Sequence, residues 1–281
     1  MSLTIGKPDG LDSDQIAVIR ALADTFEHEY GEPPLSDAAL THLRSTRVLH
    51  RVATDADTLV GYAQLDGDSL EIVATGPAVD ALLESVEPGP GAALLVWSHG
   101  ARSPIAPALA HRGYEQVRTL HQLRRPLDQL PAPAPLPDGV TVRPFRPGAD
   151  DAAWLSVNAA AFASHPEQAG VTAEDLGARM REPWFDPAGF LLAERDATLL
   201  GFHWTKIHAD GTGEVYVLGV APAAKGLRLG PALLSRGLES LAERGCREVL
   251  LYVDESNDHA MRLYADFGFH RHDHDIQWRS S

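Results

Sequence analysis

Two pairs of matching segments recur in the two halves of the sequence, and this repetition limits the fold more than any single motif does. Asp55–Tyr62 (DADTLVGY) and Arg195–Phe202 (RDATLLGF) each read as a polar turn followed by a strand with a glycine before an aromatic residue. A second match joins His111–Arg125 and Asp266–Arg279, where a Gly-aromatic pair at a helix end precedes a polar strand. Two related domains are therefore predicted, with chance similarity between two α/β halves as the alternative.

A proline-rich stretch separates the halves. The segment Pro126–Gly139 reads PLDQLPAPAPLPDG, and its prolines remove backbone donors that a helix or a central strand needs. Alternating Pro and Ala residues favour an extended spacer. We therefore predict a first domain over 1–125, a linker over 126–139 and a second domain over 140–281, which suits a chain of 281 residues.

Charge and cysteine content narrow the class of protein. The formal net charge is −15 and no run of Lys and Arg interrupts it, which disfavours nucleic acid and anionic membranes as partners. Cys246 is the single cysteine, so neither an intrachain disulfide nor a thiolate-based zinc site can form. The N-terminus lacks a signal segment, and no apolar run approaches the about 20 residues that span a bilayer. A cytoplasmic monomer is expected.

The stretch Glu214–Leu234 (EVYVLGVAPAAKGLRLGPALL) reads as a strand, a loop of small residues and a helix that opens at Gly230 and Pro231. Such a loop directs backbone N–H groups and the positive end of the helix dipole at one point, which suits an anion such as phosphate. The segment TGPAVDALLESVEPGPG, which follows the strand Leu70–Ala74, has no basic residue, and no Gly-x-Gly turn leads from the strand into its helix. Only the second half is predicted to keep an anion cradle.

Periodicity predicts the remaining elements of the second half. The expected helices cover 149–162, 172–182 and 256–267, besides the one after the loop. The expected strands cover 190–194, 199–207, 214–220, 248–253 and 270–278. His270, His272 and His274 share one face of the last strand and could bind zinc, but the interleaved charged residues favour a solvated strand and no metal.

The order of these elements and their motifs resembles the GNAT acetyltransferases. The resemblance rests on Leu218–Val220, on the loop Lys225–Gly230, and on Asn257–Phe269, which follows the family pattern N-x-x-A-x-x-x-Y-x-x-x-G-F. The runs AAFASHPEQAG, WFDP, GFHWTKIH, GEVYVLGV, LLYV and LRRPLDQLPAP are similar to the branch of tandem GNAT enzymes that completes mycothiol synthesis. The resemblance covers nearly the whole chain.

The resemblance implies an α/β (α+β) fold of two tandem GNAT domains, each a mixed, largely antiparallel twisted sheet flanked by helices. It makes the first domain one with a degenerate acyl-CoA loop and the second the catalytic one. The implied reaction moves acetyl from acetyl-CoA to the cysteinyl amine of cysteinyl-glucosaminyl-inositol. The alternatives are a GNAT enzyme for another small amine or a peptide N-terminus, and a catalytically silent protein that binds acyl-CoA.

Acyl transfer to an amine needs a neutral nucleophile, a polarised thioester carbonyl and a proton for the leaving thiolate. The resemblance assigns the general base to Glu214, which heads its strand, and the general acid to Tyr264 on a later helix. A strand-end surface carboxylate and a packing tyrosine are the alternatives for these two residues.

The resemblance also implies two sets of binding residues. Acetyl-CoA contacts are expected at Leu218, Gly219, Val220, Lys225, Gly226, Leu227, Arg228, Leu229, Gly230, Pro231, Asn257, Asp258, His259, Ala260, Met261 and Arg262. Acceptor contacts are expected at Asp37, Glu167, Lys206, Glu214 and Tyr252, with solvated surface groups as the alternative. Carboxylates suit the hydroxyl and ammonium groups of such an acceptor, and a lysine donates to sugar oxygens.

Arg228 departs from the family pattern, which has glycine at the centre of the loop, where backbone often approaches pyrophosphate closely. Two outcomes stay open. Arg228 holds ordinary dihedrals and directs its guanidinium at a phosphate, which preserves binding, or it crowds the cradle and weakens the affinity for acetyl-CoA. Retained binding is the expected outcome.

Overall fold

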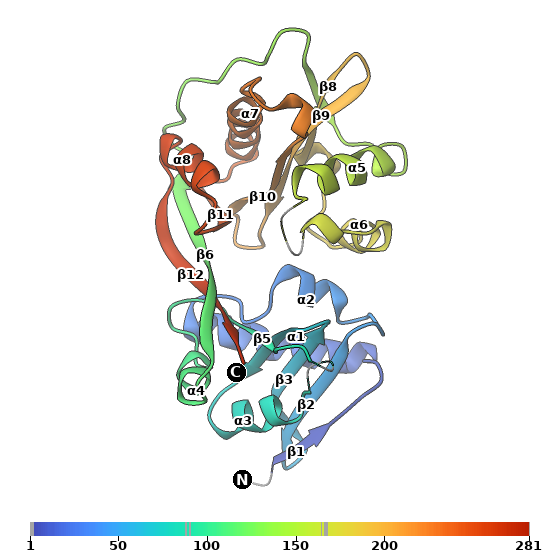
Figure 1. The fold of residues 1–281 in the computed structure, drawn as a ribbon, viewed down its shortest axis with the longest axis vertical. Helices are drawn as coiled ribbons and strands as arrows, with labels where there is room; N and C mark the ends of the chain where they lie inside the picture. Colours follow the sequence, from blue (N-terminus) through green and yellow to red (C-terminus); the bar gives the residue numbers. More distant parts are fainter. Residues whose placement is uncertain (1–2, 88, 90, 164, 166–167, 281) are drawn as a thin grey trace. The chain divides into compact units, whose positions relative to one another are not determined.

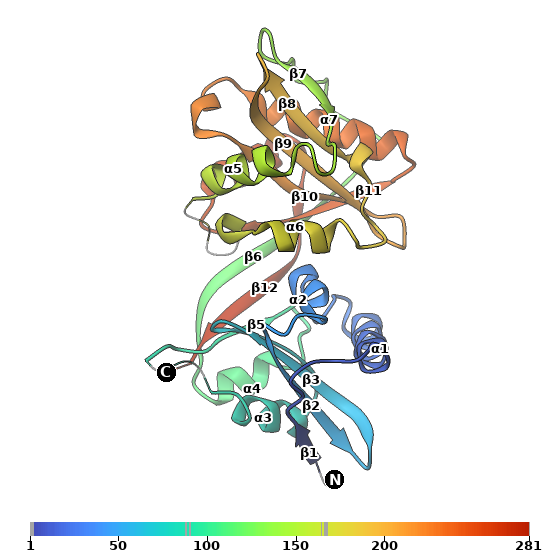
Figure 2. The same cartoon turned by 90° about the vertical axis from the view of Figure 1, so that its right-hand side faces the viewer.

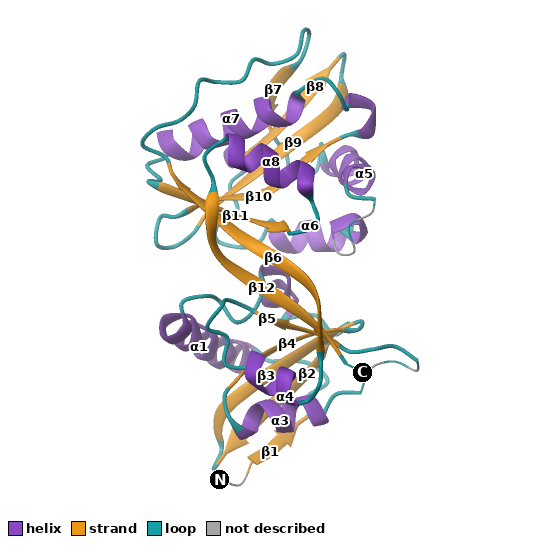
Figure 3. Cartoon of the chain, turned by 60° about the vertical axis from the view of Figure 1, so that its left-hand side comes forward, coloured by secondary structure: helices purple, strands orange, loops and turns teal. Residues whose placement is uncertain are grey.

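The computed structural model describes residues 3–87, 89, 91–163, 165 and 168–280, which divide into two compact units (Figures 1 and 2). The first unit comprises Met1–His121, Asp254–Ser256 and Asp273–Ser281, and the second comprises Gln122–Val253 and Asn257–His272. Each unit is a mixed sheet with helices on both faces (Figure 3). This is the α/β architecture expected from the sequence.

The sheet of the first unit has the strand order β1–β2–β3–β4–β5–β12. Its strands are β1 (Leu3–Gly6), β2 (Leu49–Asp55), β3 (Thr58–Asp66), β4 (Ser69–Ala74), β5 (Leu95–Ser98) and β12 (His270–Arg279). Neighbours are antiparallel except β4 and β5, which are parallel. The end of β12 pairs with β5 from Ile276 opposite Ser98 to Arg279 opposite Leu95. The last strand of the sequence therefore completes the sheet of the first unit.

Helices cover both faces of this sheet. They are α1 (Ser13–Tyr30), α2 (Asp37–His42), α3 (Pro77–Glu84) and α4 (Ala106–His111). A capping box starts α1, because the Asp12 side chain accepts from the Gln15 N–H and the Gln15 side chain accepts from the Asp12 N–H. Buried Ile19 and Phe26 of α1 pack with Tyr62 of the sheet, while α3 and α4 line a separate core.

The sheet of the second unit has the strand order β6–β11–β10–β9–β8–β7. Its strands are β6 (Glu115–Pro126), β7 (Thr141–Pro144), β8 (Phe190–Arg195), β9 (Thr198–Ile207), β10 (Gly213–Val220) and β11 (Glu248–Asp254). The strands β7 to β10 pair antiparallel, and β10 pairs parallel with β11. The unit boundary falls within β6, so residues from the end of this strand belong to the second unit.

Four helices flank this second sheet, with α5 and α7 on either side of β9 and β10 (Figure 1). They are α5 (Asp151–Ala161), α6 (Ala173–Arg179), α7 (Leu229–Glu243) and α8 (Asp258–Asp266). Trp154 of α5 packs edge-on against Trp204 of β9, with 5.7 Å between the ring centroids. No helix among the described residues is long and apolar enough to cross a membrane.

Small residues bring α7 very close to the sheet. A Cβ atom at Gly237 would lie 1.9 Å from Cε1 of His203, so only glycine fits where α7 crosses β9. Nδ1 of His203 lies 2.8 Å from the Leu233 carbonyl oxygen. Burial lowers the pKa of His203 to about 4, so at neutral pH the ring is uncharged and Nδ1 donates to that carbonyl. This contact sets the distance between α7 and β9.

The strands and helices predicted for the second half all form, with ends shifted by a few residues. The helix after the loop begins at Leu229, one residue before the predicted start, and α6 ends at Arg179. The proline-rich stretch contains no helix or strand after Pro126, yet it packs on the second unit. The Leu127 N–H donates to the Arg247 carbonyl at 2.8 Å. The division at 125 and 139 stays a prediction.

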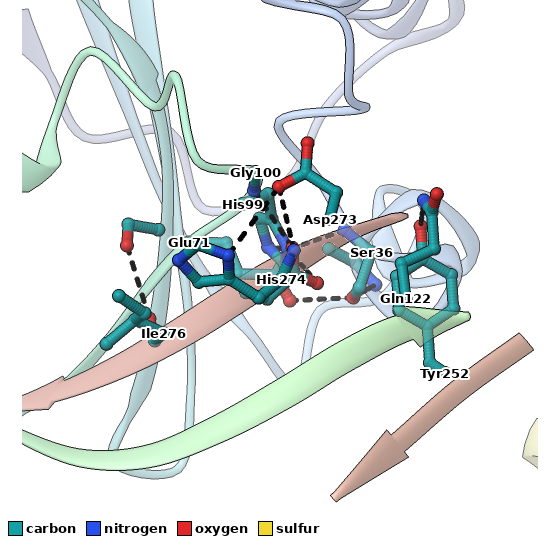
Figure 4. A network of polar contacts seen from close by, with 12 residues as sticks. Ser36, Glu71, His99, Gly100, Gln122, Tyr252, Asp273, His274 and Ile276 are labelled. Carbon is teal, nitrogen blue, oxygen red and sulfur yellow. Dashed lines mark hydrogen bonds and ion pairs between the residues drawn. The ribbon is translucent and has the colours of Figure 1, made fainter. Parts of the chain in front are cut away.

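A buried polar network joins three strands of the first unit (Figure 4). Nδ1 of His99, just after β5, lies 3.0 Å from Oδ2 of Asp275 on β12, and its Nε2 lies 3.4 Å from Oε2 of Glu71 on β4. The second carboxylate oxygen of Asp275 accepts from the Gly100 N–H, and Glu71 accepts from the N–H and hydroxyl of Ser36. Burial alone would lower the pKa of His99, but the two carboxylates outweigh it and raise that pKa to about 10.

The stabilisation supplied by His99 should therefore disappear at high pH. A pKa raised from 6.5 to about 10 on folding contributes fully below pH 6.5 and is lost as pH rises toward 10. We expect the difference in unfolding free energy between the native protein and a His99→Gln variant to shrink by up to about 1.4 kcal/mol per pH unit in this window. Urea denaturation at several pH values measures it, and a difference that stays constant would contradict the charged state of His99.

Candidate active site

Pairing between β10 and β11, the two central strands of the second unit, ends at Glu214. Registered pairs between β10 and β11 occur at Gly213 with Val249 and at Glu214 with Leu250. Although β10 continues to Val220 and β11 to Asp254, no further pair joins them in the part of the chain that is described. The strands therefore splay after Glu214, and backbone groups on this side of β10 are left for another partner.

A β-bulge lies at the same place on the other side of β10. Val215 pairs with Thr205 of β9 and Val217 pairs with Trp204, so Tyr216 is the additional residue. A bulge bends its strand and increases its local twist. The bulge and the end of the β11 ladder fall within two residues of each other, which makes this the point where β10 turns away from β11.

Glu214 is buried, with 6% of its surface exposed. Its Oε2 lies 2.8 Å from Nε2 of His208 and 3.8 Å from Nζ of Lys206, the residue opposite it on β9. Nζ of Lys206 lies 5.2 Å from the centre of the Trp184 ring and 5.8 Å from that of Tyr216. Two basic groups thus lie beside this buried carboxylate, and the two aromatic rings lie beside Lys206.

The loop after β10 forms an open cradle at the start of α7. Arg228 is the N-cap residue of α7, with φ 58° and ψ 28°, and its side chain makes no capping hydrogen bond. The first N–H groups of an α-helix have no partner within the helix, so these can bind an anion. Lys225 and Arg228 are exposed, and a Cβ atom at Gly226 (φ 86°) would meet nothing within 4 Å.

Arg228 therefore does not have the ordinary dihedrals that one of the two open outcomes assumed. It adopts the left-handed conformation, which glycine adopts at no steric cost but which is unfavourable for arginine. The loop holds Arg228 at a positive φ, although arginine prefers a negative φ, so the backbone of this residue is strained.

Helix α8 adds a buried phenol and an exposed N-terminal turn. Asn257 caps α8, since its Oδ1 accepts from the Ala260 N–H at 3.1 Å. Tyr264 is buried against Phe269, with 5.7 Å between the ring centroids, and burial raises the pKa of Tyr264 to about 12. The phenol therefore keeps its proton at neutral pH. A Cβ atom at Gly230 would lie 4.0 Å from Leu263, so α8 approaches the start of α7.

The structure gathers most of the predicted site residues in the second unit. Tyr252 is 38% exposed on β11, and its hydroxyl accepts from the side-chain amide of Gln122 at 2.9 Å. Asp37 is the first residue of α2 and belongs to the first unit, unlike the predicted site residues of the second unit. Glu167 lies outside the described residues. The roles assigned to all of these residues stay predictions.

Sequence reasoning missed His208, and it assigned Trp184 no part in the site. A signal for His208 was available, because residues two apart along a strand share a face. His208 directly follows β9 and comes two residues after Lys206. Trp184 does pack against Trp204, at 5.8 Å between centroids, but it also faces Lys206. The bulged Tyr216 could not be recognised, since a bulge depends on the pairing of two strands.

The residues present fit an acyl-CoA. The parted strands offer backbone groups to an extended chain, and the start of α7 offers N–H groups to phosphate. Glycine is required at position 219 by packing within the unit, because a Cβ atom there would lie 2.7 Å from the Phe202 ring. Asp258 and Arg262 of α8 are exposed, and their charged groups lie 3.8 Å apart.

Comparisons with known proteins agree with this geometry. The model of the Acetyltransferase (GNAT) family matches residues 154–269. A mycothiol acetyltransferase of Thermomonospora curvata is 47% identical, over 97% of this chain and 96% of that protein. One of Streptomyces avermitilis is 46% identical, over 96% of this chain and 93% of that protein.

Solved structures support the fold. A GCN5-related N-acetyltransferase from Sphaerobacter thermophilus has a TM-score of 0.67 and 24% identity, covering 99% of this chain and 95% of that one. A tandem GNAT protein from the clavulanic acid biosynthesis pathway has a TM-score of 0.66 and 16% identity, covering 99% and 98%. These two likenesses extend the tandem GNAT fold over the whole chain.

Replacing Arg228 should separate the strain of the loop from the charge of the side chain. Relief of the left-handed backbone should make Arg228→Gly more stable than Arg228→Ala by about 1 kcal/mol. Both variants lose the guanidinium, and we expect both to bind acetyl-CoA about fivefold more weakly, as for one lost exposed phosphate contact. Thermal denaturation and calorimetric titration measure the two effects. Tighter binding in both variants would show that the arginine crowds the cradle.

Proposed function

This chain belongs to the family of mycothiol acetyltransferases, within the GNAT acetyltransferases, and we propose that it acetylates the cysteinyl amine of cysteinyl-glucosaminyl-inositol. It is an acyltransferase, and GNAT enzymes use acetyl-CoA as the co-substrate. The products would be mycothiol and CoA. The observation that carries the proposal is the position of Glu214, a buried carboxylate at the last registered pair before β10 and β11 part.

Glu214 is the proposed general base. The acceptor amine is an ammonium ion at neutral pH, and it must lose a proton before it can attack. A carboxylate that is held by two basic neighbours and shielded from water is well placed to take this proton, directly or through one water molecule. Attack on the carbonyl carbon then forms the amide bond.

Backbone groups are proposed to bind the acyl-CoA. When bound, it supplies a thioester whose carbon accepts the amine and whose sulfur leaves. The N–H near Leu218 lies beyond the point where β10 and β11 part, and it would polarise the thioester carbonyl. The amides of Gly219 and Val220 would pair with the pantetheine, and the start of α7 would hold the pyrophosphate.

Tyr264 is the proposed general acid. Its pKa, raised to about 12 by burial, keeps the phenol protonated when the thiolate leaves. No hydrogen bond joins its hydroxyl to another described residue, so the proton is available for transfer. The sulfur–carbon bond breaks as the sulfur takes this proton, and the second proton that the nitrogen loses as the amide forms returns to the phenolate through water.

Lys206 and the aromatic rings beside it are proposed to form the acceptor side of the site. An ammonium donor over Trp184 and Tyr216 suits a ligand that offers both sugar oxygens and apolar ring faces. Asp37, Glu167 and Tyr252 are proposed as further acceptor contacts. The polyhydroxylated acceptor is what distinguishes this proposal from acetylation of another amine.

Lys206→Met tests the acceptor. Methionine keeps the packing over both rings but removes the ammonium donor. We expect the KM for cysteinyl-glucosaminyl-inositol to rise about tenfold, which corresponds to about 1.4 kcal/mol of lost binding. The KM for acetyl-CoA and the rate with a cysteine amide that lacks the sugar should change little. An unchanged KM for the pseudodisaccharide would argue against this acceptor.

Glu214→Gln tests the base. Removing a general base typically lowers the rate by about a hundredfold or more, so kcat at neutral pH should fall by this amount while the dissociation constant for acetyl-CoA stays nearly constant. Glu243→Gln, at the exposed end of α7, is the matched control. Steady-state kinetics and calorimetry measure both effects. An equal loss of acetyl-CoA binding would make Glu214 a structural residue, and binding without turnover in the native protein would favour a silent acyl-CoA-binding protein.

A further inference from the structure

The hairpin between β9 and β10 holds a histidine against the proposed base. The His208 N–H donates to the Thr212 carbonyl at 2.8 Å, and the Gly211 N–H donates to the His208 carbonyl at 2.9 Å, which closes the turn. From this turn Nε2 of His208 reaches Oε2 of Glu214 at 2.8 Å. The His208 side chain is 30% exposed, whereas that of Glu214 is 8% exposed. The imidazole thus connects a buried carboxylate with solvent.

Each turnover leaves a proton on Glu214, and this proton must leave before the next acceptor can react. Lys206, the other basic group within 4 Å of the carboxylate among the described residues, cannot take a proton while it is an ammonium ion. An imidazole can take one and release it near neutral pH. His208 therefore contacts the carboxylate, is partly exposed to water, and has a side chain that can take up and release a proton.

Other charged groups also face the hairpin. Asp210 lies in the same turn, where its carboxylate accepts from the Thr212 N–H at 2.8 Å and from the Thr212 hydroxyl at 3.0 Å. Hydrogen bonding to Thr212 is the main cause that lowers the pKa of Asp210, and the charges of His208 and Arg124 add to it. Asp210 thus places a second carboxylate in the turn that holds His208.

We propose that His208 positions Glu214 and carries its proton to solvent. The inference rests on the proposed function, in which Glu214 is the base. The N–H bond of the acceptor ammonium breaks as an O–H bond forms on Glu214. The imidazole that receives this proton carries its own proton on Nδ1, so Nε2 takes the proton from the carboxylic acid and the imidazolium releases the Nδ1 proton to water. The imidazole is left with its proton on Nε2, from which it donates to the Glu214 carboxylate. Proton exchange with water restores the Nδ1–H form for the next turnover, and no other reactant is needed.

Two substitutions separate proton transfer from positioning. His208→Ala removes both the contact and the relay, and His208→Gln keeps an N–H donor for the carboxylate but cannot carry a proton. The matched control is His272→Ala, an exposed histidine of β12 in the same unit. Product formation is followed by chromatography at constant ionic strength, over a range of pH and of added imidazole, with acetyl-CoA saturating.

We expect His208→Ala and His208→Gln to lower kcat about ten- to a hundredfold with little change in the KM for acetyl-CoA. Added imidazole should restore the rate of His208→Ala in a saturable manner, and should not change the native protein or His272→Ala. The acidic limb of the pH profile of His208→Ala should move to higher pH, because the carboxylate loses a donor that favours its charged form.

Three results would overturn the relay. They are an unchanged kcat in His208→Ala, a loss that imidazole does not restore in a protein with a native melting temperature, and full activity in His208→Gln. Failure of the proposed function would look different, because the native protein would then not acetylate cysteinyl-glucosaminyl-inositol. The same imidazole series would in that case be run on whichever amine it does acetylate.

Discussion

The end of the ladder between β10 and β11 at Glu214 is the constraint on which the second unit depends. Parallel strands that stayed paired would use the backbone groups of β10 within the sheet. Pairing between β10 and β11 stops after Glu214 and Leu250. Strand β10 therefore carries a buried carboxylate at its last residue paired with β11, and beyond it backbone groups that are not paired with β11. The bulge at Tyr216 accommodates this change of direction on the β9 side.

The helix that follows is held by close packing rather than by its cap. Arg228 gives α7 no side-chain cap and lies in a left-handed conformation, so the helix start is locally unfavourable. Contact along the rest of α7 compensates, since Gly237 lies against His203, and Leu229 and Leu233 lie close to Gly201. Tertiary packing thus leaves the first N–H groups of α7 open to a ligand.

The strands and helices of the second unit could be predicted from the sequence, whereas the geometry of the site depends on pairing between distant segments. Alternation and glycine placement predicted the strands and helices from Phe190 to Trp278, because these are local properties. The splay after Glu214, the bulge and the contact of His208 with Glu214 arise from how strands pair, which no local pattern encodes. The partner of the last strand was likewise hidden, since the sequence from His270 onward shows a strand but not which sheet it joins.

That last strand has a consequence for how the chain acquires its structure. The sheet of the first unit needs the segment from Asp273 onward, so the part of β12 that pairs with β5 is synthesised only after the second unit. Until then β5 is an open edge, and Trp278, whose indole N–H donates to Ser98, is missing from the core. A gene cut within the proline-rich stretch would give two fragments, the first without its closing strand and the second without the end of β6. The two halves are therefore related in sequence but depend on each other to mature.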